Sequence, residues 1–156
     1  MREIRKNMYS FCLLISFALI LSAPPGEAAE SEAQAAFGVQ RYTENIIAPD
    51  FSLKNLNGQL VRLSEYRGNI VVLGFFATWW GPCRKESPSL EAFYQAYKDK
   101  KLRLFRINIK EDEQKVRDFA RELGLNFPIL LDSNGEITSN YGIRAHPTAY
   151  FIGPKG

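Results

Sequence analysis

A nine-residue apolar segment, residues 69–77 (NIVVLGFFA), constrains the fold of this chain more than any other feature. A strand with apolar residues at consecutive positions is buried on both faces, as in the centre of a parallel sheet covered by helices. A turn containing Gly81 and Pro82 follows the segment. Apolar residues then recur at helical spacing, at Leu90, Phe93, Tyr94 and Tyr97. The pattern therefore predicts a central strand that leads through a short turn into a helix packed on the sheet.

The rest of the chain alternates between strand and helix patterns. Two short apolar segments, residues 51–53 and 60–63, flank the turn sequence Asn55-Leu56-Asn57-Gly58 and predict a β-hairpin. Further strands are expected at residues 102–109, 127–131 and 148–152. A helix that stops at Gly124 and a second, short helix separate them. This order predicts an α/β fold with a mainly parallel central sheet, flanked by helices and preceded by an N-terminal hairpin.

The first 29 residues have the pattern of a secretory signal peptide. Basic residues precede an apolar run over residues 8–23, and the small residues Ala28 and Ala29 follow it. The run is shorter than the roughly 20 residues that a spanning helix needs, so cleavage is expected, with an uncleaved anchor as the alternative. The chain is therefore expected to be exported, to a periplasm or to the outer face of the cytoplasmic membrane.

The predicted domain boundaries leave one cysteine in the exported protein. Residues 30–48 are polar and alanine-rich and are expected to form a linker, and residues 49–156 are expected to form a single domain. Cys12 lies in the leader, which leaves Cys83. Disulfides persist outside the cytoplasm, yet a single cysteine cannot form one within the molecule. Such a thiol is reactive, joined to a partner, or buried and inert.

Charge and composition argue against several classes of function. The chain has 20 Lys and Arg residues against 17 Asp and Glu residues, a net charge of +3, and they are scattered along the sequence. Nucleic-acid binding would favour a concentrated basic stripe, so we expect these charges to lie on a solvated surface. One histidine and one mature cysteine do not make a zinc site. No glycine-rich phosphate loop is present, and we expect neither a metal nor a cofactor.

Two sequence signatures lie about sixty residues apart. The first joins residues 48–51 (APDF), 76–79 (FATW) and 81–86 (GPCRKE), and the second is residues 141–148 (YGIRAHPT). Together they resemble the TlpA/ResA branch of the thioredoxin superfamily, in which the second signature is a cis-proline loop. The resemblance implies a thioredoxin-like fold in which the two signatures face each other. It also implies an exported thiol–disulfide oxidoreductase, of a family that reduces disulfides, notably on apocytochrome c.

The chain departs from that family at the first position of the active-site turn. The family has two cysteines separated by two residues, whereas Trp80 occupies the first position here and Cys83 the second, resolving position. Thiol–disulfide exchange needs a thiolate to attack and a second thiol to resolve the mixed disulfide, and an indole does neither. We therefore expect the two-cysteine cycle to be lost, with single-thiol chemistry remaining at Cys83.

The resemblance also implies which residues surround the thiol. The substrate-binding set is Trp79, Gly81, Pro82, His146 and Pro147. We expect Trp79 to pack against the domain beside the site. His146 either exchanges a proton with Cys83 or is a partly exposed loop residue. Glu86, three residues after Cys83, either tunes the thiol or is a solvated helix carboxylate. Gly74 stands where thioredoxins proper bury an acid.

Three functions remain open from the sequence. The first is a redox protein whose single thiol traps partners as mixed disulfides, and the second is a binding module that holds extended, cysteine-containing chains without turning them over. A one-cysteine peroxidase is the weakest, because Trp80 and Phe76 stand where that branch has a threonine and a proline. The expected partners are thiols and disulfides of exported proteins, together with a thiol-reducing protein of the membrane.

The family pattern continues past residues 153–156 with another strand and a closing helix. We therefore expect the domain to be C-terminally incomplete, either because the sequence is a fragment or because these elements are lacking. The strand at 148–152 would then have unpaired backbone groups along one edge.

Overall fold

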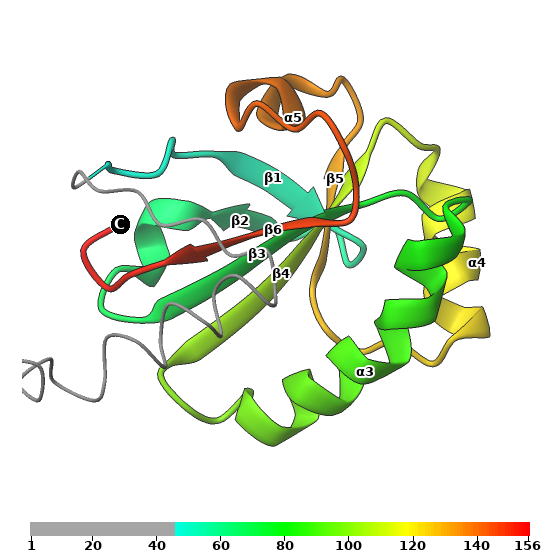
Figure 1. Cartoon of the computed structure of the whole chain (residues 1–156), viewed down its shortest axis with the longest axis horizontal. Coiled ribbons are helices and arrows are strands. Elements are labelled where there is room, and N and C mark those ends of the chain that lie inside the picture. Colours follow the sequence, from blue (N-terminus) through cyan, green and yellow to red (C-terminus); the bar gives the residue numbers. More distant parts are fainter. Residues whose placement is uncertain (1–45) are drawn as a thin grey trace, which may run out of the picture. The chain divides into compact units, whose positions relative to one another are not determined.

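The computed structural model of the chain describes residues 46–156. The predicted signal peptide and most of the predicted linker lie outside the described residues. Within the described part, six strands form one sheet in the order β2-β1-β5-β4-β3-β6 (Figure 1). The fold is thioredoxin-like, as the sequence predicts. None of the helices in residues 46–156 is long and apolar enough to cross a bilayer.

The centre of the sheet is parallel. The apolar run forms β3 (Ile70–Phe76), which pairs in parallel with β4 (Leu102–Ile109), and β4 pairs in parallel with β5 (Ile129–Asp132). The last strand, β6 (Thr148–Ile152), pairs antiparallel with β3. The sheet is thus mixed, with the predicted parallel arrangement confined to its three central strands.

The predicted N-terminal hairpin is present. It consists of β1 (Ser52–Asn55) and β2 (Leu60–Arg62), and β1 also pairs antiparallel with β5. The Asn55 side chain closes the turn, because its Oδ1 accepts the backbone N–H groups of Asn57 and Gln59, each at 2.9 Å. Gly58 has φ of 77°, a left-handed conformation that favours glycine.

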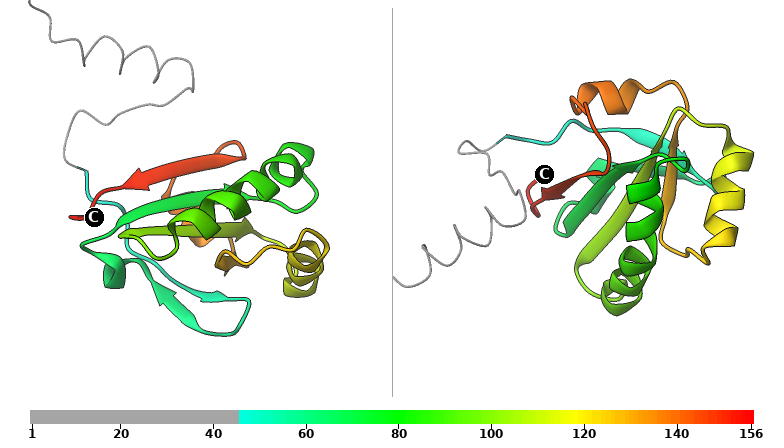
Figure 2. Two further views of the ribbon diagram at one scale, coloured as in Figure 1. Left: turned by 90° about the horizontal axis from the view of Figure 1, so that it is seen from below. Right: turned by 45° about the vertical axis from the view of Figure 1, so that its right-hand side comes forward.

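Helices cover both faces of the sheet. One core layer contains buried residues of α3 (Gly81–Tyr97) and α4 (Glu113–Glu122), and the other contains those of the 3₁₀ turn η1 (Leu63–Tyr66) and of α5 (Glu136–Asn140). Figures 1 and 2 show α3 and α4 beside each other on the same side of the sheet. The helix α4 ends before Gly124, the predicted stop, where φ is 63°.

Alternate residues of β3 enter opposite core layers, which explains the continuous apolar run. Leu73 and Phe75, both 0% exposed, pack in the layer beneath η1 and α5. Val72 and Phe76 pack in the layer beneath α3 and α4. Burying each such large apolar side chain contributes about 1.5–3 kcal/mol. The end of β3 is thereby fixed between two packed layers, and the chain that leaves it enters the site from a rigid support.

Candidate functional site

The two signature segments meet at one end of the sheet. The turn between β3 and α3 carries Trp79 and Trp80, and the loop before β6 carries His146. The ring centroids of Trp79 and His146 lie 5.6 Å apart, those of Trp80 and His146 5.8 Å, and those of the two indoles 5.8 Å. The bond between His146 and Pro147 is cis. We call Trp79, Trp80 and His146 the aromatic cluster.

The aromatic cluster faces solvent. Trp79 is 67% exposed and Trp80 is 40% exposed, whereas His146 is half-buried. The expectation that Trp79 packs against the domain is therefore wrong, since its ring contacts are with the other two members of the cluster. A large exposed aromatic surface on a fixed turn can stack against an extended partner chain.

Cys83 lies beneath the surface. It is 0% exposed and belongs to the apolar layer between the sheet and α3, with Phe76 and Phe119. Pro82 precedes it in the first turn of α3, where the missing N–H of proline is not needed. Within residues 46–156 no hydrogen bond joins His146 to Cys83, and the imidazole packs against the indoles instead.

The environment of Cys83 favours the neutral thiol. Burial raises the pKa of Cys83 above its ordinary value, and a backbone hydrogen bond at Ala77 and the charge of Arg106 act in the opposite direction. Glu86 and Glu111 add to the rise. Burial outweighs the position at a helix N-terminus, which by itself would lower the pKa. In this conformation Cys83 is enclosed, and its surroundings disfavour the thiolate.

Arg106 is the main departure from the sequence expectations. Its residue is 3% exposed, so the prediction that the charges lie on a solvated surface is wrong at this position. Its Nη2 donates to Oε1 of Glu86 at 2.6 Å, and its guanidinium carbon lies 5.1 Å from the ring centroid of Phe76. Glu86 is therefore an ion-pair partner rather than a free solvated carboxylate.

Gly74 makes room for that arginine. The two residues are direct partners in the β3–β4 pairing, and a Cβ at Gly74 would lie 2.8 Å from Cδ of Arg106. A glycine in the interior of a strand often marks such a close approach, and this was the available sequence signal. Where thioredoxins proper bury an acid, this chain has a glycine covered by a basic side chain.

A second polar network, missed in the sequence, holds the active-site turn. The carboxylate of Glu111 accepts the backbone N–H of Thr78 at 2.7 Å and its hydroxyl at 2.6 Å. The same carboxylate accepts Nδ2 of Asn108 at 2.6 Å. Thr78 follows β3 and Glu111 follows β4, so the signal was a pair of polar residues beyond the carboxyl ends of adjacent parallel strands.

The cis-proline loop has its own anchors. The hydroxyl of Tyr150 donates to the carbonyl oxygen of Tyr141, and the hydroxyl of Tyr141 donates to that of Pro49, both at 2.7 Å. Burial raises the pKa of Tyr141, so its hydroxyl keeps the proton that it donates. Thr148 donates to the carbonyl of Ala145 at 2.7 Å. Both loops of the site are thus held by side chains from beneath.

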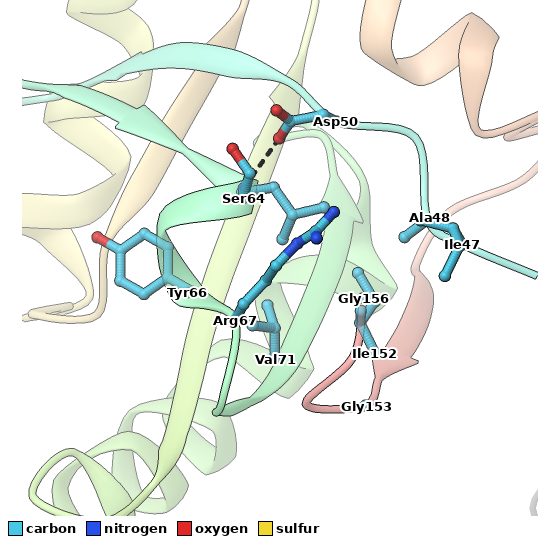
Figure 3. A pocket seen from close by; sticks show the side chains of 11 residues that line it. Ile47, Ala48, Asp50, Ser64, Tyr66, Arg67, Val71, Ile152, Gly153 and Gly156 are labelled. Carbon is cyan, nitrogen blue, oxygen red and sulfur yellow. Dashed lines mark hydrogen bonds between the residues drawn. The ribbon is translucent and has the colours of Figure 1, made fainter.

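A small cavity lies at the opposite end of the sheet (Figure 3). It borders Val71 at the start of β3, and Oδ1 of Asp50 accepts the N–H of Ser64 at its rim. From Val71 to Phe76 the strand rises roughly 17 Å, so the cavity is remote from Cys83. Its volume is about 30 Å³, enough for one or two water molecules. It is too small to be a substrate site.

Comparisons with known proteins agree with the geometry. Residues 45–156 match the model of the AhpC/TSA family. The thioredoxin-like protein YneN of Bacillus subtilis is 42% identical over 112 residues, 70% of this chain and 65% of the relative. The thiol-disulfide oxidoreductase ResA of Bacillus subtilis is 33% identical over 119 residues, 76% of this chain and 66% of the relative. The match thus spans just under two thirds of the length of these relatives.

The solved structures extend this likeness to the fold. A crystal structure of a putative thiol:disulfide interchange protein DsbE from Chlorobium tepidum has a TM-score of 0.66 at 31% identity, covering 70% of this chain and 77% of that one. The name of this neighbour, like that of ResA, describes thiol–disulfide chemistry.

Proposed function

The chain belongs to the AhpC/TSA family and resembles the thiol–disulfide oxidoreductases of the TlpA/ResA kind, and we propose that it is an exported member whose two-cysteine cycle is lost. Single-thiol chemistry at Cys83 remains. The observation that carries the proposal is the position of Trp80, one turn before Cys83 and in contact with His146 of the cis-proline loop. An indole thus occupies the place where the attacking thiol would meet a partner.

The remaining chemistry is one half of the family's reaction. The Cys83 thiolate attacks one sulfur of a partner's disulfide, a new sulfur–sulfur bond forms, and the partner's own disulfide breaks. The second partner sulfur leaves as a thiolate and takes a proton from water. The number of disulfides is unchanged, so no external oxidant is needed. Without a neighbouring thiol, the mixed disulfide persists until a thiol from another molecule resolves it.

The burial of Cys83 makes this reaction conditional on binding. The thiol is 0% exposed, and the aromatic cluster at the mouth of the site is the exposed surface that a partner meets first. An extended chain that stacks on the indoles would shift these side chains and bring its sulfur toward Cys83. The partners we propose are exported proteins with disulfides, and a thiol-reducing membrane protein that releases the adduct.

A second function is favoured by the same burial. In it the aromatic cluster holds an extended, cysteine-containing chain, and Cys83 is an inert core residue. Replacing Trp79 by alanine would weaken peptide binding in either case. Since Trp79 is 67% exposed, the change should leave the folded state stable, so a loss of affinity reports on binding alone.

Intact-mass analysis separates the two functions. The full chain carrying Cys12→Ser, so that Cys83 is its only thiol, is incubated with a peptide that contains a disulfide. An adduct with the mass of one peptide half, absent when Cys83 is also replaced by serine, supports the single-thiol function. Binding without an adduct supports the second function, and the absence of both would refute the assignment of the site.

A further inference from the structure

Arg106 is a cation inside an apolar layer. Its side chain is 4% exposed, and the layer that surrounds it between the sheet and α3 includes Val72, Phe76 and Leu104. Alternation along β4 places Leu104, Arg106 and Asn108 on the same face of the sheet. Burying a guanidinium destabilises the folded state unless the charge is paired, so Arg106 needs partners within this layer.

Three elements fix the guanidinium. Glu86 of α3 accepts its Nη2 at 2.6 Å, the ring of Phe76 at the end of β3 lies under it at 5.1 Å, and Gly74 of β3 leaves the space that its stem crosses. The planar, permanently charged guanidinium suits this combination of a carboxylate and an aromatic face better than an ammonium does. The charge is therefore held in one place.

That place is in the layer that contains the thiol. Cys83 packs in the same apolar layer as Phe76, over which the guanidinium lies, and Cys83 and Glu86 are three residues apart on one face of α3. The charged groups that act on Cys83 are Arg106 from β4, Glu86 from α3 and Glu111 from the loop after β4. Two of them are carboxylates, which oppose a thiolate, and Arg106 is the cation that offsets them.

We propose that Arg106 is a positioning residue for Cys83, which fixes Glu86 and supplies the positive charge that stabilises the Cys83 thiolate in an otherwise apolar and acidic environment. The inference rests on the proposed single-thiol function, since it concerns the reactive form of that thiol. Arg106 thereby has a role in the chemistry although it lies in β4, outside both signatures. The guanidinium favours the thiolate over the neutral thiol, and the pair with Glu86 keeps the positive charge in place.

The test is a pH titration of Cys83 by NMR, with ¹³C at its Cβ, in the full chain carrying Cys12→Ser. Replacing Arg106 by methionine should raise the pKa of Cys83, because the two carboxylates then act unopposed. Arg106→Lys should give a smaller rise. Arg103→Met, on the same strand but bonded to the carbonyls of Lys100 and Leu102, is the matched control and should leave the titration unchanged.

A second variant, Glu86→Gln, distinguishes an electrostatic effect on the pKa of Cys83 from a purely structural one. Glu86→Gln removes a carboxylate and leaves the arginine, so it should lower the pKa of Cys83. Loosened packing would move both variants in the same direction. The proposal is overturned if Arg106→Met and Arg106→Lys titrate as Arg103→Met does, or if Glu86→Gln shifts the pKa upward; should Arg106→Met fail to fold, Arg106→Lys and Glu86→Gln decide the matter.

The titration tests the role of Arg106, and the mass analysis tests the single-thiol function, so the two proposals can be refuted separately. If Cys83 titrates as expected but no peptide adduct forms, the single-thiol function is wrong and the electrostatic role of Arg106 stands. If an adduct forms at the same rate in the Cys12→Ser chain with and without Arg106→Met, with no change in titration, the function stands and the role of Arg106 is wrong.

Discussion

Gly74 and Arg106 face each other across β3 and β4, and the arginine stem occupies the space that a side chain at Gly74 would need. The contact connects β3, the apolar run at the centre of the sheet, with the charged residues of the site. It places a charge under α3 without opening the core, because the glycine contributes no side-chain volume there. The guanidinium then reaches Glu86 on the helix that carries Cys83.

Gly74→Ala should therefore destabilise the protein. The new methyl group would lie 2.8 Å from Cδ of Arg106, so the side chain must move within a packed layer, at a cost of about 1–3 kcal/mol. Denaturant unfolding measures the change. Gly153→Ala is the control, because a Cβ there meets nothing within 4 Å and its effect should stay within about 0.5 kcal/mol. Equal unfolding free energies for the two variants would show that Arg106 is not confined at Gly74.

Glu111→Ala should loosen the active-site turn. It removes the acceptor for the N–H and hydroxyl of Thr78 and for the amide of Asn108, and hydrogen bonds to a charged group contribute about 1.5–3 kcal/mol. We expect a loss of about 2–4 kcal/mol in the free energy of unfolding, less than the sum of three such bonds because water can replace part of the carboxylate at this half-buried site, together with faster amide exchange at Thr78.

The control for Glu111 is a carboxylate in a more exposed ion pair. Glu122→Ala breaks the ion pair between Glu122 and Arg84, whose side chains are 59% and 36% exposed, respectively. The loss in the free energy of unfolding should be less than about 1 kcal/mol. A cost for Glu111→Ala no larger than that for Glu122→Ala would mean that the buried network does not hold the turn.

Glu91 should make stability depend on pH in the acidic range. Burial tends to raise the pKa of this carboxyl, but hydrogen bonds from the side chains of Gln95 and Asn126 and from the N–H groups of Asn126 and Phe127 outweigh it and lower the pKa. A lowered pKa in the folded state contributes stability above the unfolded pKa of the carboxyl. That contribution is lost as the pH falls through the folded value.

The measurement compares Glu91→Gln with the unsubstituted chain between neutral and acidic pH. The stability difference should be largest near neutral pH and shrink as Glu91 becomes protonated. A difference that is constant across this range would contradict the assignment.

The sequence predicts the helices and strands better than it predicts which of their polar residues are buried. The apolar run of β3, the hairpin turn at Asn55 and the stop at Gly124 are local signals, and each appears in the structure. Strand periodicity in LRLFRINI places Arg103 and Arg106 on opposite faces, but both faces of a central strand are covered. Only the position of α3 and Glu86 determines that Arg106 is enclosed and paired.

Exposure within the site was equally hard to predict. Trp79 follows a buried strand and looks like a core residue, yet the turn ends in solvent, where Trp79 is 67% exposed and its ring lies against Trp80 and His146. The burial of Cys83 depends on the packing of α3 against α4 and β3, which no spacing along the chain specifies. The two signatures, in contrast, did indicate that the turn and the cis-proline loop meet.

A thiol titration of Trp80→Cys in a glutathione redox buffer, with Cys12→Ser as background, measures directly whether Trp80 stands where an attacking thiol would complete the site. We expect one intramolecular disulfide between positions 80 and 83 under oxidising conditions and two free thiols under reducing conditions, together with disulfide-reductase activity on a model substrate that the Cys12→Ser chain with Trp80 lacks. Two thiols that stay free, or pair only with glutathione, under oxidising conditions would contradict this expectation.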